Sequence, residues 1–126
     1  MFTHVRLGTN DPQASAAFYD ATFAALGIAG NRHEDNAYYG GYDGAFFSVG
    51  PARDGEPATH ANGGTIGLKA DSQAQVDGWH AAGIAHGGTD EGAPGRRDMG
   101  EHKLYGAYLR DPTGNKICAF TTNVED

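Results

Sequence analysis

Residues 2–27, FTHVRLGTNDPQASAAFYDATFAALG, place a strand of alternating polarity directly before a helix. Successive residues of a strand point to opposite faces, so Val5 and Leu7 share one face while His4 and Arg6 share the other. The first face is suited to a core. The second face carries a base and a cation, so it either meets water or lines a cavity in which His4 acts.

The helix that follows this strand has clear ends. Asp11 suits the N-cap, and Gly27 suits the C-terminal stop. Residues 63–88, GGTIGLKADSQAQVDGWHAAGIAHGG, repeat the same plan of a strand and then a helix. A shift of 61 residues superposes the two segments, and His4 then falls on Thr65. The chain is therefore predicted to contain a structural repeat.

Each half continues with a predicted hairpin. Residues 36–50, NAYYGGYDGAFFSVG, turn at an Asp-Gly pair, and residues 103–120, KLYGAYLRDPTGNKICAF, turn at DPTGN. Weaker strands are predicted in residues 30–35 and 87–92, and the polar loop 51–64 joins the halves.

The repeat predicts an α+β fold in two tandem modules, each a βαββ or βαβββ unit. We place the first module at about residues 1–57 and the second at about 62–126. One such unit cannot cover its own sheet, so both are expected to pack into a single domain, 1–126.

Composition limits the partners. The net charge is −7 and the acidic residues are scattered, which argues against nucleic acid, because nucleic-acid binding needs a basic surface. No apolar run approaches the roughly 20 residues of a membrane span. The single cysteine, Cys118, excludes an intramolecular disulfide, so a cytoplasmic protein without a membrane partner is predicted.

The opening H-V-R-L-G-T-N-D…A-F-Y and the closing Y-L-R-D-P-T-G-N-K-I resemble the vicinal oxygen chelate superfamily, which includes glyoxalase I, extradiol dioxygenases, fosfomycin-modifying enzymes and bleomycin-binding resistance proteins. The resemblance implies a homodimer and two curled mixed sheets around a cavity, with the helices outside. It places Val5, Leu7, Ile66 and Leu68 under the helices. It places His4, Arg6, Thr65, Gly67 and Lys69 in the cavity.

The resemblance also implies where a metal would bind. In metal-dependent members, four His, Glu or Gln side chains from the first and last strands of each module hold one divalent ion. The corresponding positions here are His4, Phe47, Thr65 and Cys118, or Ser48 in place of Phe47 if the register shifts by one residue. Only His4 is a good ligand, so we predict no metal and no cofactor; the alternative is a divalent metal at His4.

A small-molecule site is expected in the cavity. The predicted ligand-binding residues are His4, Arg6, Phe47, Thr65, Tyr105, Cys118 and His102, the last from a loop that closes the cavity mouth or is simply exposed. The predicted aromatic walls are Tyr38 or Tyr39, Tyr42, Phe47, Tyr105 and Tyr108. The predicted catalytic pair is His4 as base and Cys118 as nucleophile, although a lone strand cysteine is more often a small buried hydrophobe.

Three functions fit these features. The first is a glyoxalase/bleomycin resistance/dioxygenase-like protein of undetermined activity that binds a small organic molecule and has lost the family metal site. The second is an enzyme, a metal-dependent lyase or dioxygenase that uses His4. The third is a bleomycin-type resistance protein that sequesters a cationic, ring-bearing drug, which suits the acidic net charge.

Overall fold

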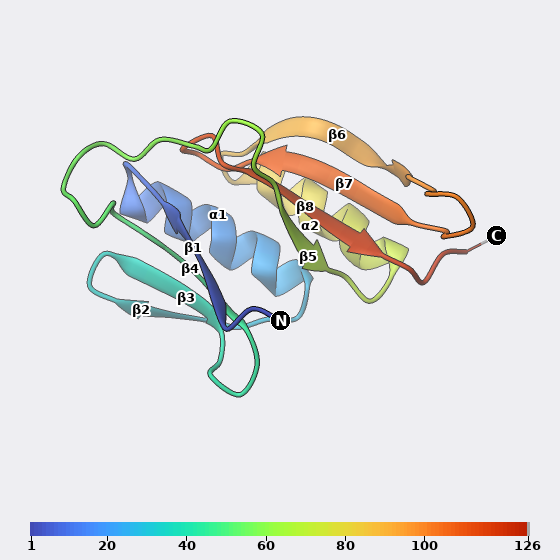
Figure 1. The fold of residues 1–126 in the computed structure, drawn as a ribbon, viewed down its shortest axis with the longest axis horizontal. Helices are drawn as coiled ribbons and strands as arrows, with labels where there is room; N and C mark the ends of the chain where they lie inside the picture. The colour runs from blue at the N-terminus through green and yellow to red at the C-terminus, as the bar shows by residue number, and fades with distance from the viewer. Residues whose placement is uncertain (126) are drawn as a thin grey trace.

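The computed structural model describes residues 1–125 and contains two four-stranded sheets and two helices (Figure 1). The elements of the first module are β1 (His4–Gly8), α1 (Pro12–Ala25), β2 (Gly30–His33), β3 (Asn36–Gly40) and β4 (Phe46–Gly50). Those of the second are β5 (Ile66–Lys69), α2 (Gln73–Ala85), β6 (Thr89–Arg96), β7 (Tyr105–Arg110) and β8 (Lys116–Thr121). The weak strands expected near residues 30–35 and 87–92 are present as β2 and β6.

The two sheets have the same topology. Their strand orders are β1-β4-β3-β2 and β5-β8-β7-β6, with the first strand of each module parallel to the last and all other pairs antiparallel. The prediction of an α+β fold made of two βαβββ modules with curled mixed sheets is confirmed. The sheets remain open rather than closing on each other.

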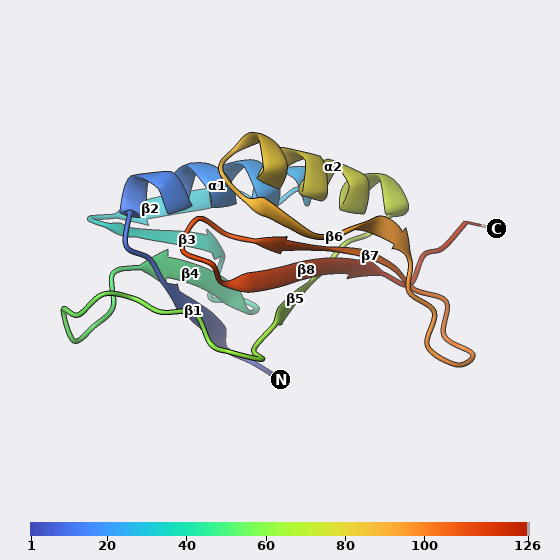
Figure 2. The ribbon, with the colours of Figure 1, turned by 90° about the horizontal axis from the view of Figure 1, so that it is seen from above.

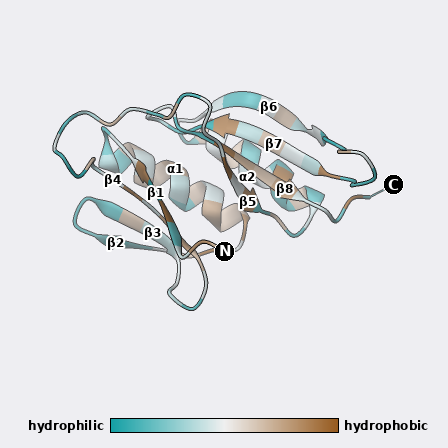
Figure 3. Ribbon diagram, in the orientation of Figure 1, coloured by the Kyte–Doolittle hydropathy of each residue, from teal (hydrophilic) through white to brown (hydrophobic). Residues whose placement is uncertain are grey.

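The helices contact each other and lie on the same side of the two sheets (Figure 2). Strong hydrophobic colouring is seen on β1, β5 and β8 (Figure 3). One buried cluster combines residues of both modules, including Phe18, Phe23, Val49, Trp79 and Leu109. Each helix therefore covers its own sheet and also the helix of the other module.

The predicted face of the first strand in each module is correct. Val5, Leu7, Ile66 and Leu68 all pack against the shared core. The predicted helix start is also correct, because Asp11 caps α1 by accepting a hydrogen bond from the backbone N–H of Ala14 at 3.1 Å. The positive φ of Gly27, 75°, ends the same helix as expected.

The turn between β7 and β8 ties the two modules together. The buried carboxylate of Asp111 accepts hydrogen bonds from the backbone N–H groups of Thr113 (3.0 Å) and Asn115 (2.9 Å), and from the Tyr19 hydroxyl of α1 (2.6 Å). Asn115 in turn donates from its side chain to the carbonyl of Gly8 at 3.0 Å. The DPTGN motif is thus a structural joint between modules.

Two glycines of α2 should respond in opposite ways to alanine. A Cβ at Gly83 would lie 2.3 Å from Leu109 Cδ1 and 3.1 Å from Phe18 Cε1, so Gly83→Ala is expected to overpack the core at a cost of about 1–3 kcal/mol. This cost exceeds the gain in helix propensity of about 1 kcal/mol. A Cβ at Gly78 would lie 3.8 Å from Ala25 Cβ, an ordinary contact, so Gly78→Ala should stabilise by about 0.5–1 kcal/mol. Urea denaturation measures both, and a Gly83→Ala protein more stable than wild type would contradict the packing argument.

Candidate functional site

The helices cover one face of each sheet, and we call the other the open face. In the first sheet, Arg6, Ser48 and Tyr38 form one row across the open face, since paired residues share a face. In the second sheet the equivalent row is Gly67, Cys118 and Tyr108. The repeat thus places Ser48 and Cys118 at matching positions.

The open face of the first sheet carries an aromatic group. His4 stacks on Phe46 with ring centroids 4.9 Å apart and planes 8° apart. Phe46 also meets Tyr42 at 5.0 Å and Tyr38 at 6.2 Å. These last three rings, together with Asn31, Arg32, His33, Gly40 and Gly41, line a cavity of about 400 Å³. Aromatic walls with a few polar groups are typical of small-molecule sites.

Arg6 crosses the same face. It starts on β1 and reaches over β4 to β3, where Nη2 donates to Asn36 Oδ1 at 3.0 Å; Nη2 also donates to the carbonyl of Pro51 at 3.0 Å. Gly50 makes the crossing possible. A Cβ there would lie 2.1 Å from Asn36 Oδ1 and 2.8 Å from Arg6 Nη2. The guanidinium is thus held in place by neutral acceptors.

The open face of the second sheet has its own aromatic pair. Tyr108 meets Phe120 edge to face at 5.6 Å, and Lys116 Nζ lies 5.2 Å from the centre of the Tyr108 ring. The Phe120 ring covers Gly106, where a Cβ would come within 2.7 Å of it. Phe120 and Lys69 also border a hollow of about 460 Å³. Each sheet therefore presents aromatic rings and a cation on its open face.

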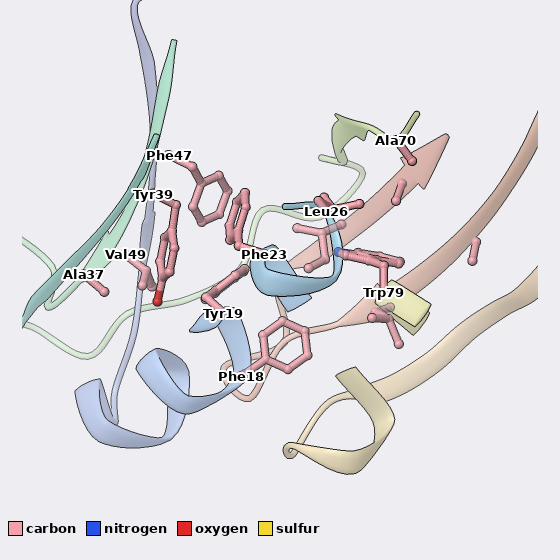
Figure 4. Close-up of a cluster of buried hydrophobic side chains, with 14 of the residues drawn as sticks. Phe18, Tyr19, Phe23, Leu26, Ala37, Tyr39, Phe47, Val49, Ala70 and Trp79 are labelled. Atoms are coloured by element: carbon pink, nitrogen blue, oxygen red, sulfur yellow. The ribbon is translucent and has the colours of Figure 1, made fainter. Parts of the chain in front are cut away.

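The prediction that Phe47 lines the cavity is wrong. Phe47 is 5% exposed and packs against α1, with its ring 4.9 Å from Tyr19 and 5.2 Å from Phe23 (Figure 4). Its neighbour Ser48 occupies the open-face position, as the alternative register anticipated.

Tyr105 was also expected in the cavity, and the structure places it on the helix side. Its hydroxyl donates to Asp77 Oδ1 of α2 at 2.6 Å, and this hydrogen bond raises the pKa of Tyr105. Tyr39 likewise packs in the core, whereas Tyr38 and Tyr108 lie on open faces.

Two predicted residues lie apart from the aromatic cavity. Thr65 precedes β5 and borders a small space of about 80 Å³ with Leu7, Asn115 and Lys116. His102 is exposed in the β6–β7 loop and pairs with Met99 through two backbone hydrogen bonds of 2.9 and 3.0 Å. This loop lies at the end of the second sheet away from β1 (Figure 2).

The sequence reasoning missed Phe46 and Phe120. The parallel pairing of β1 with β4 puts Phe46 opposite His4 and on the same face, but this register cannot be read from the sequence. The aromatic pair Phe46-Phe47 hid it, since neither member is polar. Asn36 was missed because nothing local marks it as a partner of Arg6.

Cys118 is 6% exposed, and burial raises the pKa of its thiol. A raised pKa lowers the fraction of reactive thiolate at neutral pH. We therefore expect native protein to react with iodoacetamide at pH 8 at least about 10-fold more slowly than protein unfolded in urea. Loss of free thiol measured over time checks this. Equal rates in the two states would contradict the burial of Cys118 and restore it as a nucleophile.

With the register of β4 known, the positions that the family resemblance implied for a metal are His4, Ser48, Thr65 and Cys118. His4 Nδ1 lies 2.9 Å from the Thr3 hydroxyl, and the Ser48 hydroxyl donates to the Val5 carbonyl at 3.5 Å. Neutral hydroxyls and a protonated thiol are weak ligands for the divalent ions that the family uses. Within residues 1–125 no group of three or more His, Cys, Asp or Glu side chains is placed to hold a metal ion. Of the four positions, only His4 carries a side chain that commonly binds such ions.

A family model described as the Glyoxalase/Bleomycin resistance protein/Dioxygenase superfamily matches residues 1–119. The chain belongs to this superfamily. A comparison with functionally curated proteins finds no match.

Several solved structures are similar. A glyoxalase/bleomycin resistance protein from Albidiferax ferrireducens T118 is 49% identical, with a TM-score of 0.91 over 96% of this chain and 98% of that one. A family enzyme from Burkholderia phytofirmans PsJN is 20% identical, with a TM-score of 0.70 over 95% and 97%. Lactoylglutathione lyase from Agrobacterium tumefaciens is 22% identical, with a TM-score of 0.62 over 96% and 92%. The latter two likenesses show the fold alone.

Within the described residues, no helix is long and apolar enough to cross a membrane.

Proposed function

We propose that this superfamily member binds a small organic molecule with an aromatic part on the open face of its first sheet. The observation that carries the proposal is the cavity of about 400 Å³ walled by Tyr38, Tyr42 and Phe46. Phe46 contacts Tyr38, Tyr42 and His4, and these rings lie on a face that no helix covers, so they offer a stacking surface to a ligand ring. In this proposal, residues 1–126 form a single domain, and its aromatic cavity walls bind the ligand.

We further propose that binding does not use the family metal. Of the four positions, only His4 carries a side chain that commonly binds divalent ions, and the raised pKa of Cys118 disfavours the thiolate form that a metal needs. The reaction class, if any, therefore differs from that of the metal-dependent lyases and dioxygenases. Cys118 as the lone cysteine also supports a cytoplasmic location.

Elemental analysis tests the metal proposal. Untagged protein is incubated with Fe(II), Mn(II), Ni(II) or Zn(II), passed through a desalting column and measured for metal per chain. We expect far less than one ion per chain, and the same value for wild type and His4→Ala. One bound ion per chain that is lost in His4→Ala would overturn the proposal and favour a metal-dependent lyase or dioxygenase.

We also propose a homodimer. The open faces carry half-buried rings, and β1 and β5 each pair on one side only, so both modules have surfaces that a second copy would cover. Small organic ligands bound between two open faces would lose contact with water on both sides. Light scattering coupled to size-exclusion chromatography gives the mass, and a monomer at micromolar concentration would contradict this part of the proposal.

A further inference from the structure

The charges of this chain are unevenly distributed over the fold. The sequence has 9 Lys and Arg residues against 16 Asp and Glu residues. Six of these cations lie in strands, but only two of the acids do, and both acids are on β6. The strand cations are Arg6, Arg32, Lys69, Arg96, Arg110 and Lys116. The acidic surface therefore belongs to helices and loops, while the sheets are cationic.

Three of the strand cations are neutralised by ion pairs. Arg32 pairs with Asp20, Arg96 with Asp98, and Arg110 with Glu91. These ion pairs lie at or beside β2 and β6, at the edge of each sheet opposite β1 and β5.

The other three strand cations, Arg6, Lys69 and Lys116, form no ion pair with a carboxylate among residues 1–125. All three are on open faces, because each alternates with a core residue of the same strand. Asp54 borders a neighbouring hollow with Arg6, but its Oδ1 accepts the backbone N–H of Glu56 at 2.9 Å. The open faces thus hold positive charge in a protein of net charge −7.

Arg6 does not line the aromatic cavity, but its guanidinium ends near two residues that do, Tyr38 and His33. Its guanidinium is fixed at Asn36, which lies two residues before Tyr38 on the same face of β3, a separation of about 7 Å along the strand. Arg6 makes its hydrogen bonds through Nη2 alone, so the Nε and Nη1 N–H groups have no acceptor among residues 1–125. A guanidinium with donors in a fixed plane is suited to a carboxylate or a phosphate.

We propose that the ligand of the first sheet's open face is a small aromatic anion, whose ring lies against Tyr38 and Phe46 and whose carboxylate or phosphate group is bound by Arg6. This inference rests on the proposed function, because it names the ligand class of the same cavity. It reverses the expectation drawn from net charge, since a cationic, ring-bearing drug would meet Arg6 and the imidazoles of His4 and His33 on that face.

Three probes with one ring system and different charges test the inference. Calorimetric titration compares 1-naphthoate, 1-naphthalenemethanol and 1-naphthylmethylammonium. We expect naphthoate to bind at least about 10-fold more tightly than the neutral alcohol, and the cation to bind most weakly, as is typical for one charge-assisted hydrogen-bonded pair. The preference should shrink as salt is raised from 20 mM to about 500 mM, because salt screens exposed charges.

Two variants assign the preference to Arg6. Arg6→Gln should weaken the binding of 1-naphthoate about 10-fold and leave the affinity for 1-naphthalenemethanol unchanged. Gly50→Ala keeps the charge but displaces the guanidinium, because its Cβ would lie 2.8 Å from Nη2, and it should weaken naphthoate as well. Arg53→Gln removes an equal charge from the exposed loop between the modules and should change nothing. Thermal melts of each variant confirm that it is folded.

The outcomes separate this inference from the proposed function. Equal binding of all three probes, or preference for the cation, overturns the anionic ligand and leaves the aromatic cavity in place. A naphthoate preference that survives in folded Arg6→Gln and Gly50→Ala proteins overturns the role of Arg6. Failure of every probe to bind overturns the aromatic cavity itself, and the inference with it.

Discussion

Asp111→Ala is expected to lower the free energy of unfolding by about 3–5 kcal/mol, because several donors lose one shared acceptor and each buried donor left without a partner costs about 1–3 kcal/mol. The Asp111 carboxylate is 4% exposed and accepts the Tyr19 hydroxyl, two backbone N–H groups and the side-chain amide of Asn115. Without it, these donors lose their acceptor, and the donors of Tyr19 and Asn115 are buried. Urea denaturation followed by circular dichroism gives the value.

Two controls separate the network from a general effect of losing a carboxylate. Tyr19→Phe removes one hydrogen bond and should cost about 1–3 kcal/mol. Asp43→Ala removes an exposed carboxylate from the β3–β4 loop and should stay within about 0.5 kcal/mol of wild type. If Asp111→Ala costs no more than Tyr19→Phe, the turn does not depend on its carboxylate and the joint between modules has another origin.

Phe47→Ala and Phe46→Ala should have opposite consequences although the residues are neighbours. Phe47 is buried against Tyr19 and Phe23, so its loss should cost about 3–5 kcal/mol of stability. Phe46 is half-buried on the open face, and its loss should cost no more than about 1 kcal/mol. Phe46→Ala should instead weaken binding of 1-naphthalenemethanol, because it removes a wall of the cavity.

Urea denaturation and calorimetric titration of Phe46→Ala and Phe47→Ala proteins test which of the two residues faces the core and which faces the ligand. A Phe46→Ala protein that is as destabilised as Phe47→Ala would contradict the register. An unchanged affinity for 1-naphthalenemethanol in a stable Phe46→Ala protein would move the ligand away from this cavity.

The fold could be predicted because its signals are periodic and local. The alternation of His4, Val5, Arg6 and Leu7 fixed the faces of β1, and the same alternation after Thr65 fixed those of β5. Helix caps and turn residues then placed the connections. These features depend on neighbours in the sequence, and each occurs twice in the chain.

The candidate site was harder to predict, because the register between paired strands decides which face of the sheet each side chain occupies. Shifting a strand by one residue moves every side chain to the opposite face, and nothing in the run Phe46-Phe47 distinguishes the two registers. Tyr105 and Tyr108 are three residues apart on β7, so alternation puts them on opposite faces, but the sequence does not say which one faces the helix.

Charge was misleading for a related reason. A net charge of −7 describes the whole surface, whereas a ligand meets only one part of it. The open faces and the acidic loops are separated by the fold, and that separation depends on which strand residues alternate with the core. Only after the faces are known does the position of Arg6 argue for an anion.

The single cluster shared by both helices has a consequence for how the chain is made. Phe18 on α1 leaves the ribosome about 60 residues before Trp79 on α2 and about 90 residues before Leu109 on β7, which belong to the same cluster. The first module therefore emerges with one side of α1 still exposed, and it stays so until most of the chain has been translated. We expect both modules of a nascent chain to fold together, after most of the chain has been made. Until then the exposed apolar side of α1 needs protection from aggregation.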